Sequence, residues 1–294
     1  MQLTPSQLSD FRRDGFVILP ELFSAAEVAA MKQDLARIQQ IDTDHLVREK
    51  SGGIAKTIYR VHEVDGPTRS PIFHAASRAP RLLDPARQLL EDEALYIHHT
   101  KCNLKTAIDG SVWQWHQDYG SWQRDGIRAP SLTTALIMLD EPTELNGCLY
   151  FIPGSHRNGS LEAEFNDATG YRFYVVPKHR LLALMARSPD PVPIIGRPGT
   201  VVFFDCNIVH ASGHNLSRHD RWQVYVVYNP VANRPEPVPA PRPDYVRSVN
   251  FEPLQRGSDD ILAAAATAGA PWNAATTGEA AVAPVAAVAE GAGK

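Results

Sequence analysis

Apolar positions in the first 40 residues follow helical spacing on either side of one short strand. Thr4 is a typical N-cap before Pro5, and this pair predicts a short helix that ends at Asp14 and Gly15. An apolar strand over 16–19 follows. Next come the Ser24 and Glu27 of a capping box and a second, amphipathic helix over about 25–40, whose apolar residues recur every three or four positions (Val28, Met31, Leu35, Ile38).

A long polar stretch separates these elements from the rest of the chain. Residues 42–72 contain the turn-forming pairs Gly52-Gly53 and Gly66-Pro67 and one short alternating run over 57–62, which predicts a single strand within a loop. Such a loop can shape a binding site or be a surface excursion, and the sequence leaves both readings open. A further helix is predicted over 80–90.

From Leu95 onward the pattern changes to short runs of β-forming residues separated by turns. Regular short strands of this kind predict an antiparallel sandwich or barrel. Asn146-Gly147 and Pro198-Gly199 supply tight turns, and a short helix over about 177–185 interrupts the series. The predicted strands cover 95–104, 112–119, 132–139, 148–152, 192–195, 200–204 and 222–228.

The composition changes again after about residue 250. Alanine, glycine and threonine dominate there, and few bulky apolar residues remain to offset the entropy of ordering the chain. We therefore expect one folded domain over 1–250 and a flexible tail over 251–294.

Overall composition narrows the class of ligand. A net charge of −4 and a pI near 6.3 give no general attraction to nucleic acid or to an anionic membrane, which favours a small-molecule substrate. The N-terminus lacks the features of a secretory signal, no apolar run approaches the roughly 18 residues of a membrane span, and the three cysteines form no CxxC pair. We expect a cytoplasmic protein, and a homodimer is compatible with the sequence although nothing in it requires one.

Candidate chemistry is concentrated between Trp113 and Tyr119. His116 and Asp118 lie two residues apart in a predicted strand, so their side chains should project from the same face. A His-x-Asp pair alone is a weak signal. Its aromatic neighbours strengthen it, because an apolar wall keeps water from a reactive metal site (Trp113, Trp115, Tyr119, Trp122). The alternative is an ordinary core with a hydrogen-bonded histidine.

A third ligand is expected from a later histidine. His210 follows a strand that ends at Phe204, and Arg221 begins another strand that can return beside it. Two histidines and a carboxylate leave three open positions on a metal, the usual ligand set of non-haem Fe(II) oxygenases. Arg221 is suited to bidentate binding of a carboxylate. We interpret His156 as a structural loop histidine and Cys206 as a packing residue.

These residues resemble a known family. The spacing of His116, Asp118, His210 and Arg221, together with the run from Asn146 to His156, is similar to the phytanoyl-CoA dioxygenase family of Fe(II)/2-oxoglutarate oxygenases. Within that family the chain most resembles the ectoine hydroxylase branch, through residues 115–122 and 103–105. The resemblance covers about residues 8–235.

The resemblance implies a mainly β fold with flanking helices, built on a double-stranded β-helix, the jelly roll of cupins. Fe(II) would be held by His116, Asp118 and His210. The 2-oxoglutarate cosubstrate would be held at its distal carboxylate by Arg221 with help from Ser212, and flanked by Asn103 and Trp113. Positions that contact substrate in relatives correspond to Trp122, Phe204, Gln223 and His99. The branch usually has glutamine near His99 and asparagine at Gln223, so the substrate need not be ectoine.

The implied reaction uses O2 and 2-oxoglutarate to hydroxylate an unactivated C–H bond, with succinate and CO2 as coproducts. Related halogenases replace the carboxylate ligand with a small residue, so Asp118 favours hydroxylation. The expected substrate is small, polar and derived from an amino acid, or ectoine-like. Two alternatives remain: an oxygenase acting on an acyl thioester, a carrier-bound substrate or a natural product, and a non-catalytic binding module on the same scaffold.

Overall fold

The computed structural model describes residues 1–48, 53, 55–110, 112–167, 173–260 and 262–263. The N-terminal prediction is confirmed: α1 (Pro5–Asp14) and α2 (Ala25–Ile38) both begin at capping boxes, and β1 (Phe16–Leu19) lies between them. Gly15 ends α1 in the left-handed conformation that a glycine adopts without strain. The remaining helices are α3 (Pro71–Ala76), α4 (Pro80–Leu90), α5 (Tyr119–Trp122) and α6 (Lys178–Met185).

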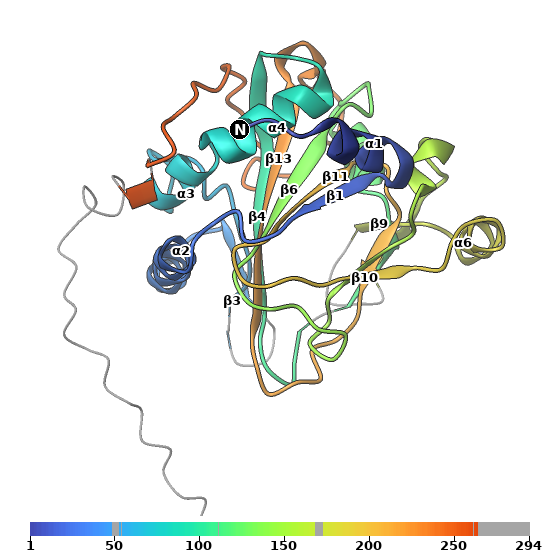
Figure 1. The fold of residues 1–294 in the computed structure, drawn as a ribbon, viewed down its shortest axis with the longest axis horizontal. Coiled ribbons are helices and arrows are strands. Elements are labelled where there is room, and N and C mark those ends of the chain that lie inside the picture. The colour runs from blue at the N-terminus through green and yellow to red at the C-terminus, as the bar shows by residue number, and fades with distance from the viewer. Residues whose placement is uncertain (49–52, 54, 111, 168–172, 261, 264–294) are drawn as a thin grey trace, which may run out of the picture.

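A seven-stranded antiparallel sheet forms the centre of the fold, in the order β1-β11-β6-β13-β4-β3-β2. The helices α2, α3 and α4 lie along one side of this sheet, and β10 and α6 lie on the other (Figure 1). The strands of this sheet besides β1 are β2 (Leu46–Arg48), β3 (Ala55–Tyr59), β4 (Leu95–Lys105), β6 (Thr133–Met138), β11 (Val201–Asp205) and β13 (Arg221–Pro230).

The second sheet has four strands in the order β10-β7-β12-β5. Successive strands pass repeatedly from one sheet to the other, which is the winding of a double-stranded β-helix and confirms the predicted fold class. Its strands are β5 (Trp113–His116), β7 (Leu149–Phe151), β10 (Val192–Ile194) and β12 (His210–Ser212), and a separate hairpin pairs β8 (Glu164–Asn166) with β9 (Phe173–Val175).

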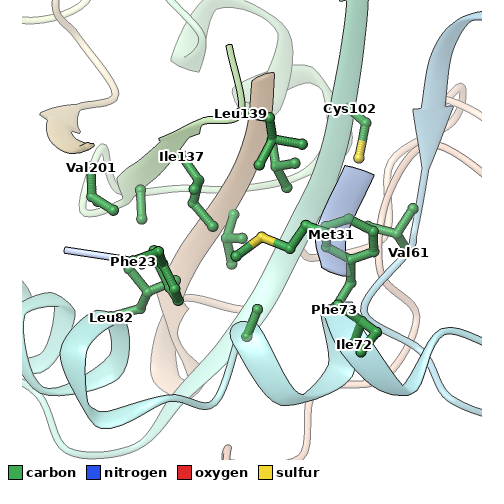
Figure 2. Packing of buried hydrophobic residues seen from close by; sticks show 14 of the residues in the cluster. Phe23, Met31, Val61, Ile72, Phe73, Leu82, Cys102, Ile137, Leu139 and Val201 are labelled. Carbon is green, nitrogen blue, oxygen red and sulfur yellow. The ribbon is translucent and has the colours of Figure 1, made fainter. Parts of the chain in front are cut away.

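Alternating residues of the large sheet pack into two different cores. Ile137 and Val201 face the helices, where they meet Met31 and Phe23 (Figure 2). Their strand neighbours face the interior of the jelly roll, together with Phe151 of the small sheet (Leu136, Met138, Val202, Phe204). The period-2 alternation of these strands therefore separates a structural core from the face that carries the site.

Some local predictions differ from the structure. The strand predicted over 112–119 ends at His116, and Asp118 already has helical dihedrals of φ −59° and ψ −39° at the start of α5. Arg221 does not return beside β12, because β13 pairs with β4 and β6 in the opposite sheet. The α-helices and strands not predicted are α3, α5, β2, β8, β9 and β12.

The predicted C-terminal tail lies mostly outside the described residues. Within its first part, the Leu254 backbone N–H donates to the Leu95 carbonyl, Arg256 forms an ion pair with Asp84, and Leu262 is buried. Every helix in the described part of the chain is too short or too polar to cross a membrane.

Candidate active site

His116, Asp118 and His210 converge at one point between the sheets. His116 ends β5, His210 begins β12, and the two residues are direct partners across these strands. Asp118 lies two residues further along the chain, at the N-cap of α5. Its Oδ1 is 3.7 Å from His116 Nε2 and 4.0 Å from His210 Nε2, and one ligand atom from each residue lies within 4.8 Å of the others. The expectation that His116 and Asp118 project from one face of a strand was wrong. The strand ends at His116, and the turn that begins α5 brings the Asp118 carboxylate to the imidazoles.

Hydrogen bonds to backbone carbonyls prepare both imidazoles to bind a metal. His116 Nδ1 donates to the Gln114 carbonyl at 2.7 Å, and His210 Nδ1 donates to the Ile208 carbonyl at 3.1 Å. Because a carbonyl can only accept, each Nδ1 carries the proton and each Nε2 presents a lone pair. These three residues therefore fit a divalent metal with two nitrogen ligands and one oxygen ligand.

Burial and neighbouring charges keep His210 and Asp118 in their metal-binding protonation states. Burial lowers the pKa of His210 to about 3, and the adjacent His116 contributes in the same direction. Burial alone would raise the pKa of Asp118, but its interactions with His116, His210 and Lys101 lower that pKa below its ordinary range. At neutral pH His210 is neutral and Asp118 is ionised, as metal binding requires.

Arg221 lies fully buried at the start of β13 with no acidic partner among the described residues. One of its terminal nitrogens donates to Gln223 Oε1, and its Nε has no hydrogen-bond partner. A buried guanidinium without a counter-charge is costly, and a carboxylate ligand would supply both the charge and the missing acceptor. The site therefore fits an anionic end of 2-oxoglutarate.

Lys105 adds a second cation beside Arg221, which is its direct partner across β4 and β13. Its Nζ donates to Ser212 Oγ at 2.9 Å and to the Gly213 carbonyl. The pKa of Lys105 is lowered to about 6, mainly by burial and also by the positive charge of Arg221. The predicted cosubstrate residues Ser212 and Arg221 therefore both neighbour Lys105, which sequence reasoning did not identify as a functional residue.

The inner face of β4 and β13 carries a ladder of polar pairs. Asn103 faces Gln223, and Lys101 faces Tyr225, one step further along the strands. Lys101 Nζ lies 4.1 Å from the centroid of the Trp113 ring, and burial lowers its pKa to about 8. The signal for this ladder was present in the sequence, since polar residues alternate with apolar ones along β4 (His99, Lys101, Asn103, Lys105).

A cavity of about 410 Å³ opens from the metal ligands. Five of the eleven predicted functional residues line it, and its aromatic side chains come from several separate segments. The segment after β13, which was not predicted to take part, supplies one wall. The lining residues include His116 and Asp118, the predicted Trp113, Trp122 and His99, and the additional Tyr59, Lys101, Phe173, Tyr225, Arg242, Tyr245 and Val246.

The predicted substrate contacts are split between this cavity and the surrounding core. Trp122 and His99 line the cavity. Phe204 is buried against Phe151 and His210, and Gln223 is buried against Arg221 and the Tyr225 hydroxyl, which donates to Gln223 Oε1 at 2.9 Å. Neither Phe204 nor Gln223 is part of the cavity wall, and their roles as substrate contacts stay predictions.

His156 and Cys206 lie apart from the ligand set. His156 packs over Gly15 and contacts the Arg12 carbonyl at 3.3 Å, which is a structural position at the end of α1. Cys206 is a buried free thiol in an apolar cluster with Tyr119 and Trp122. The metal-ligand cluster of the described residues consists of His116, Asp118 and His210.

Two histidines and one carboxylate at the end of a jelly-roll cavity define the site of a non-haem iron oxygenase. Comparison with known proteins gives the same class. Residues 11–222 match the model of the phytanoyl-CoA dioxygenase (PhyH) family. The chain therefore belongs to the phytanoyl-CoA dioxygenase family, and it is an Fe(II)/2-oxoglutarate-dependent dioxygenase.

Individual relatives support this placement over most of the chain. The ectoine dioxygenase of Sphingopyxis alaskensis is 34% identical over 82% of this chain and 81% of its own length. That of Bordetella bronchiseptica is 32% identical over 83% of this chain and 82% of its own. The crystal structure of EctD from S. alaskensis with 2-oxoglutarate and 5-hydroxyectoine aligns with a TM-score of 0.75 at 31% identity, over 87% of this chain and 88% of that one. A second EctD structure contains bound iron and has a TM-score of 0.74 at 30% identity, over the same shares of the two chains.

Proposed function

We propose that this dioxygenase hydroxylates an unactivated C–H bond of a small, polar substrate that is amino-acid-derived or ectoine-like. The observation that carries this proposal is the cavity of about 410 Å³ that starts at His116 and Asp118. Its volume is in the range of small-molecule sites, and its wall combines aromatic surface with a few polar groups. The similarity to ectoine dioxygenases supports the same substrate class.

The residues of the chain divide into three roles in this reaction. His116, Asp118 and His210 would hold Fe(II), which activates O2 when 2-oxoglutarate is bound. Arg221 and Ser212, with Lys105, would hold the distal carboxylate of 2-oxoglutarate, flanked by Asn103 and Trp113. The aromatic wall formed by Trp113, Trp122 and Phe173 would exclude water and orient the substrate C–H toward the metal.

We also infer the setting in which the enzyme works. The three cysteines are buried free thiols, which fits a reducing cytoplasm. The net charge of −4 supports a chain that binds neither nucleic acid nor membranes. A homodimer is a further prediction that sedimentation at several protein concentrations would test.

A coupled-turnover screen tests the proposed function. The purified enzyme, Fe(II), 2-oxoglutarate and O2 are incubated with ectoine, with free amino acids and their cyclic derivatives, and with acyl-thioester and carrier-bound substrates. Substrate-dependent succinate and a product that has gained one oxygen atom are expected from the small free molecules. Turnover of the thioester or carrier-bound set alone would replace the proposed substrate class by the larger one.

A further inference from the structure

Part of the cavity wall comes from residues 242–248, here called the strap. The strap follows β13 and lies beyond residues 11–222, which match the family model. Arg242, Pro243, Tyr245 and Val246 line the cavity from this segment. The strap therefore lies outside the region that the family model matches.

Several polar contacts latch the strap onto the jelly roll. Arg242 forms an ion pair with the buried Asp125, with Nε 2.8 Å from Oδ2, and the Arg242 backbone N–H donates to Oδ1 at 2.9 Å. Arg60 donates to the Asp244 carbonyl at 2.8 Å, and the Ser248 backbone N–H donates to the His98 carbonyl at 2.8 Å. These contacts fix the backbone of the strap on both sides of Val246.

The fixed backbone determines the state of His99. His99 Nδ1 donates to the carbonyl of Val246, so this nitrogen carries the ring proton. Burial lowers the pKa of His99 well below its ordinary value, and the positive charges of Arg242 and Lys101 act in the same direction. The ring is therefore neutral, and its remaining nitrogen, Nε2, has a lone pair on a side chain that lines the cavity.

We propose that His99, locked by the Val246 carbonyl, is a specificity-determining hydrogen-bond acceptor that selects substrates presenting an N–H or O–H donor to Nε2. This inference rests on the proposed function of the cavity. A glutamine, which the ectoine hydroxylase branch usually has near this position, offers both a donor and an acceptor. An imidazole held in one tautomer only accepts, so a substrate that presents only an acceptor at this point leaves two lone pairs facing each other.

The state of the ring can be measured without any substrate. The Zn(II)- and 2-oxoglutarate-loaded enzyme is labelled with ¹⁵N-histidine, and the His99 signals are assigned by their loss in His99→Gln. At pH 7 we expect a protonated Nδ1 and an unprotonated Nε2 for His99. A proton on Nε2, in either the neutral or the charged ring, would overturn the proposal.

Probe pairs test selection by the acceptor. Each pair consists of an N-acyl amino acid, whose amide N–H is its only nitrogen donor, and its N-methyl derivative, such as N-acetylalanine and N-acetyl-N-methylalanine, and a second set compares a hydroxyl with its methyl ether. In at least one of the two sets, wild-type kcat/KM should favour the donor-bearing member by about tenfold or more. The member without the donor leaves the buried Nε2 without a hydrogen bond, which is costly. His99→Phe should reduce this preference to less than about threefold without changing the KM for 2-oxoglutarate, and His99→Gln, whose amide can accept or donate, should give a preference between those of His99→Phe and the wild type.

His62→Phe is the matched control. His62 is also a buried histidine, and its Nδ1 lies 3.0 Å from Thr100 Oγ1, but it faces a different pocket. This variant should keep the wild-type preference even where its stability falls. A preference that persists in His99→Phe, or equal turnover of both members of every pair by the wild type, would overturn the proposal. If no probe is turned over, the proposed substrate class fails, and the ring-nitrogen measurement decides the role of His99 independently.

Discussion

The metal end and the substrate end of this cavity are built in different ways. At the metal end, His116 and His210 are partners across β5 and β12, and Arg221 and Lys105 are partners across β13 and β4. Hydrogen-bonded register therefore fixes these groups relative to each other. One-residue slips would turn each side chain to the opposite face of its sheet.

At the substrate end, side chains come from separate segments. Tyr59 comes from β3, Trp122 from α5, Phe173 from β9, and Arg242 and Val246 from the strap. No single sheet register relates them, and individual contacts such as the Asp125–Arg242 ion pair hold them in place. The positions of the metal-end residues thus depend on the sheet pairing that defines the fold. The substrate end can change when a single segment, such as the strap, is altered.

The largest expected effect is the loss of a metal ligand. His116→Ala should lower substrate-dependent succinate formation by more than the roughly 10–100-fold cost of losing an outer-shell partner of a metal site. The overall fold should be retained, because His116 ends a strand and contributes little to either core. Succinate assays and equilibrium Fe(II) binding would measure the effect.

His179→Ala is the control for this variant, since His179 is an exposed histidine on α6. It should have wild-type turnover. Full turnover by His116→Ala would remove the metal assignment and, with it, the distinction between the two ends of the cavity.

The next largest effect concerns Arg221. Arg221→Met should weaken 2-oxoglutarate binding by about 2–3 kcal/mol, or about 30- to 150-fold in Kd, because a charged hydrogen-bond donor to the carboxylate is lost. The same substitution removes a buried charge that has no acidic partner in the described part of the chain, so the ligand-free protein should be as stable as the wild type or more stable. Thermal unfolding without 2-oxoglutarate would measure the stability of the ligand-free variant, and unfolding with it would measure the reduced stabilisation by the ligand. A large loss of stability in the ligand-free variant would contradict the assignment.

The sequence predicted the metal end well because its signals are local. Capping boxes at Thr4 and Ser24 defined helices, and β-forming runs defined the long strands. The spacing of His116, Asp118, His210 and Arg221 then identified the ligand set through family resemblance. Even here the path to Asp118 was mispredicted, because the helical turn after His116 contains no strong start signal; Asp118 lies at the cap position without a side-chain capping hydrogen bond.

The substrate end was only partly predicted because its elements depend on distant partners. β9, which supplies Phe173, has three residues and is a strand only because β8 pairs with it. The strap has no regular secondary structure, and its position depends on Asp125, more than 100 residues earlier in the chain. Local patterns of polarity carry no information about such contacts, so Trp122 and His99 were found through resemblance, whereas Arg242, Tyr245 and Val246 were missed.

A smaller effect tests the latch on the substrate end. Asp125→Asn should destabilise the protein by about 2 kcal/mol, less than a fully buried ion pair would cost because the Arg242 side chain is 30% exposed. This corresponds to a melting temperature about 4–8 °C lower. The KM of the substrate should rise by about tenfold while the Kd of 2-oxoglutarate stays within about twofold, because only the strap loses its anchor. Equal losses of affinity for the substrate and for 2-oxoglutarate would show that the strap and the metal end are coupled.

The smallest expected effect is a pH dependence at the metal end. In the ligand-free enzyme the pKa of Lys105 is lowered to about 6, and a carboxylate bound beside it would raise that pKa. Below pH 6 the ammonium is present in both states, so affinity for 2-oxoglutarate is highest there; as the pH rises above 6, binding must take up a proton and the Kd increases. Anaerobic calorimetry with Fe(II) between pH 6.5 and 8.5 should show an increase of several-fold in Kd, bounded by tenfold per pH unit.

Lys105→Met should flatten this dependence without altering substrate preference, because Lys105 contacts Ser212 and Gly213 and not the strap. An unchanged slope in that variant would mean that Lys105 does not take part in cosubstrate binding, and Arg221 would then be the only cation of the two to do so.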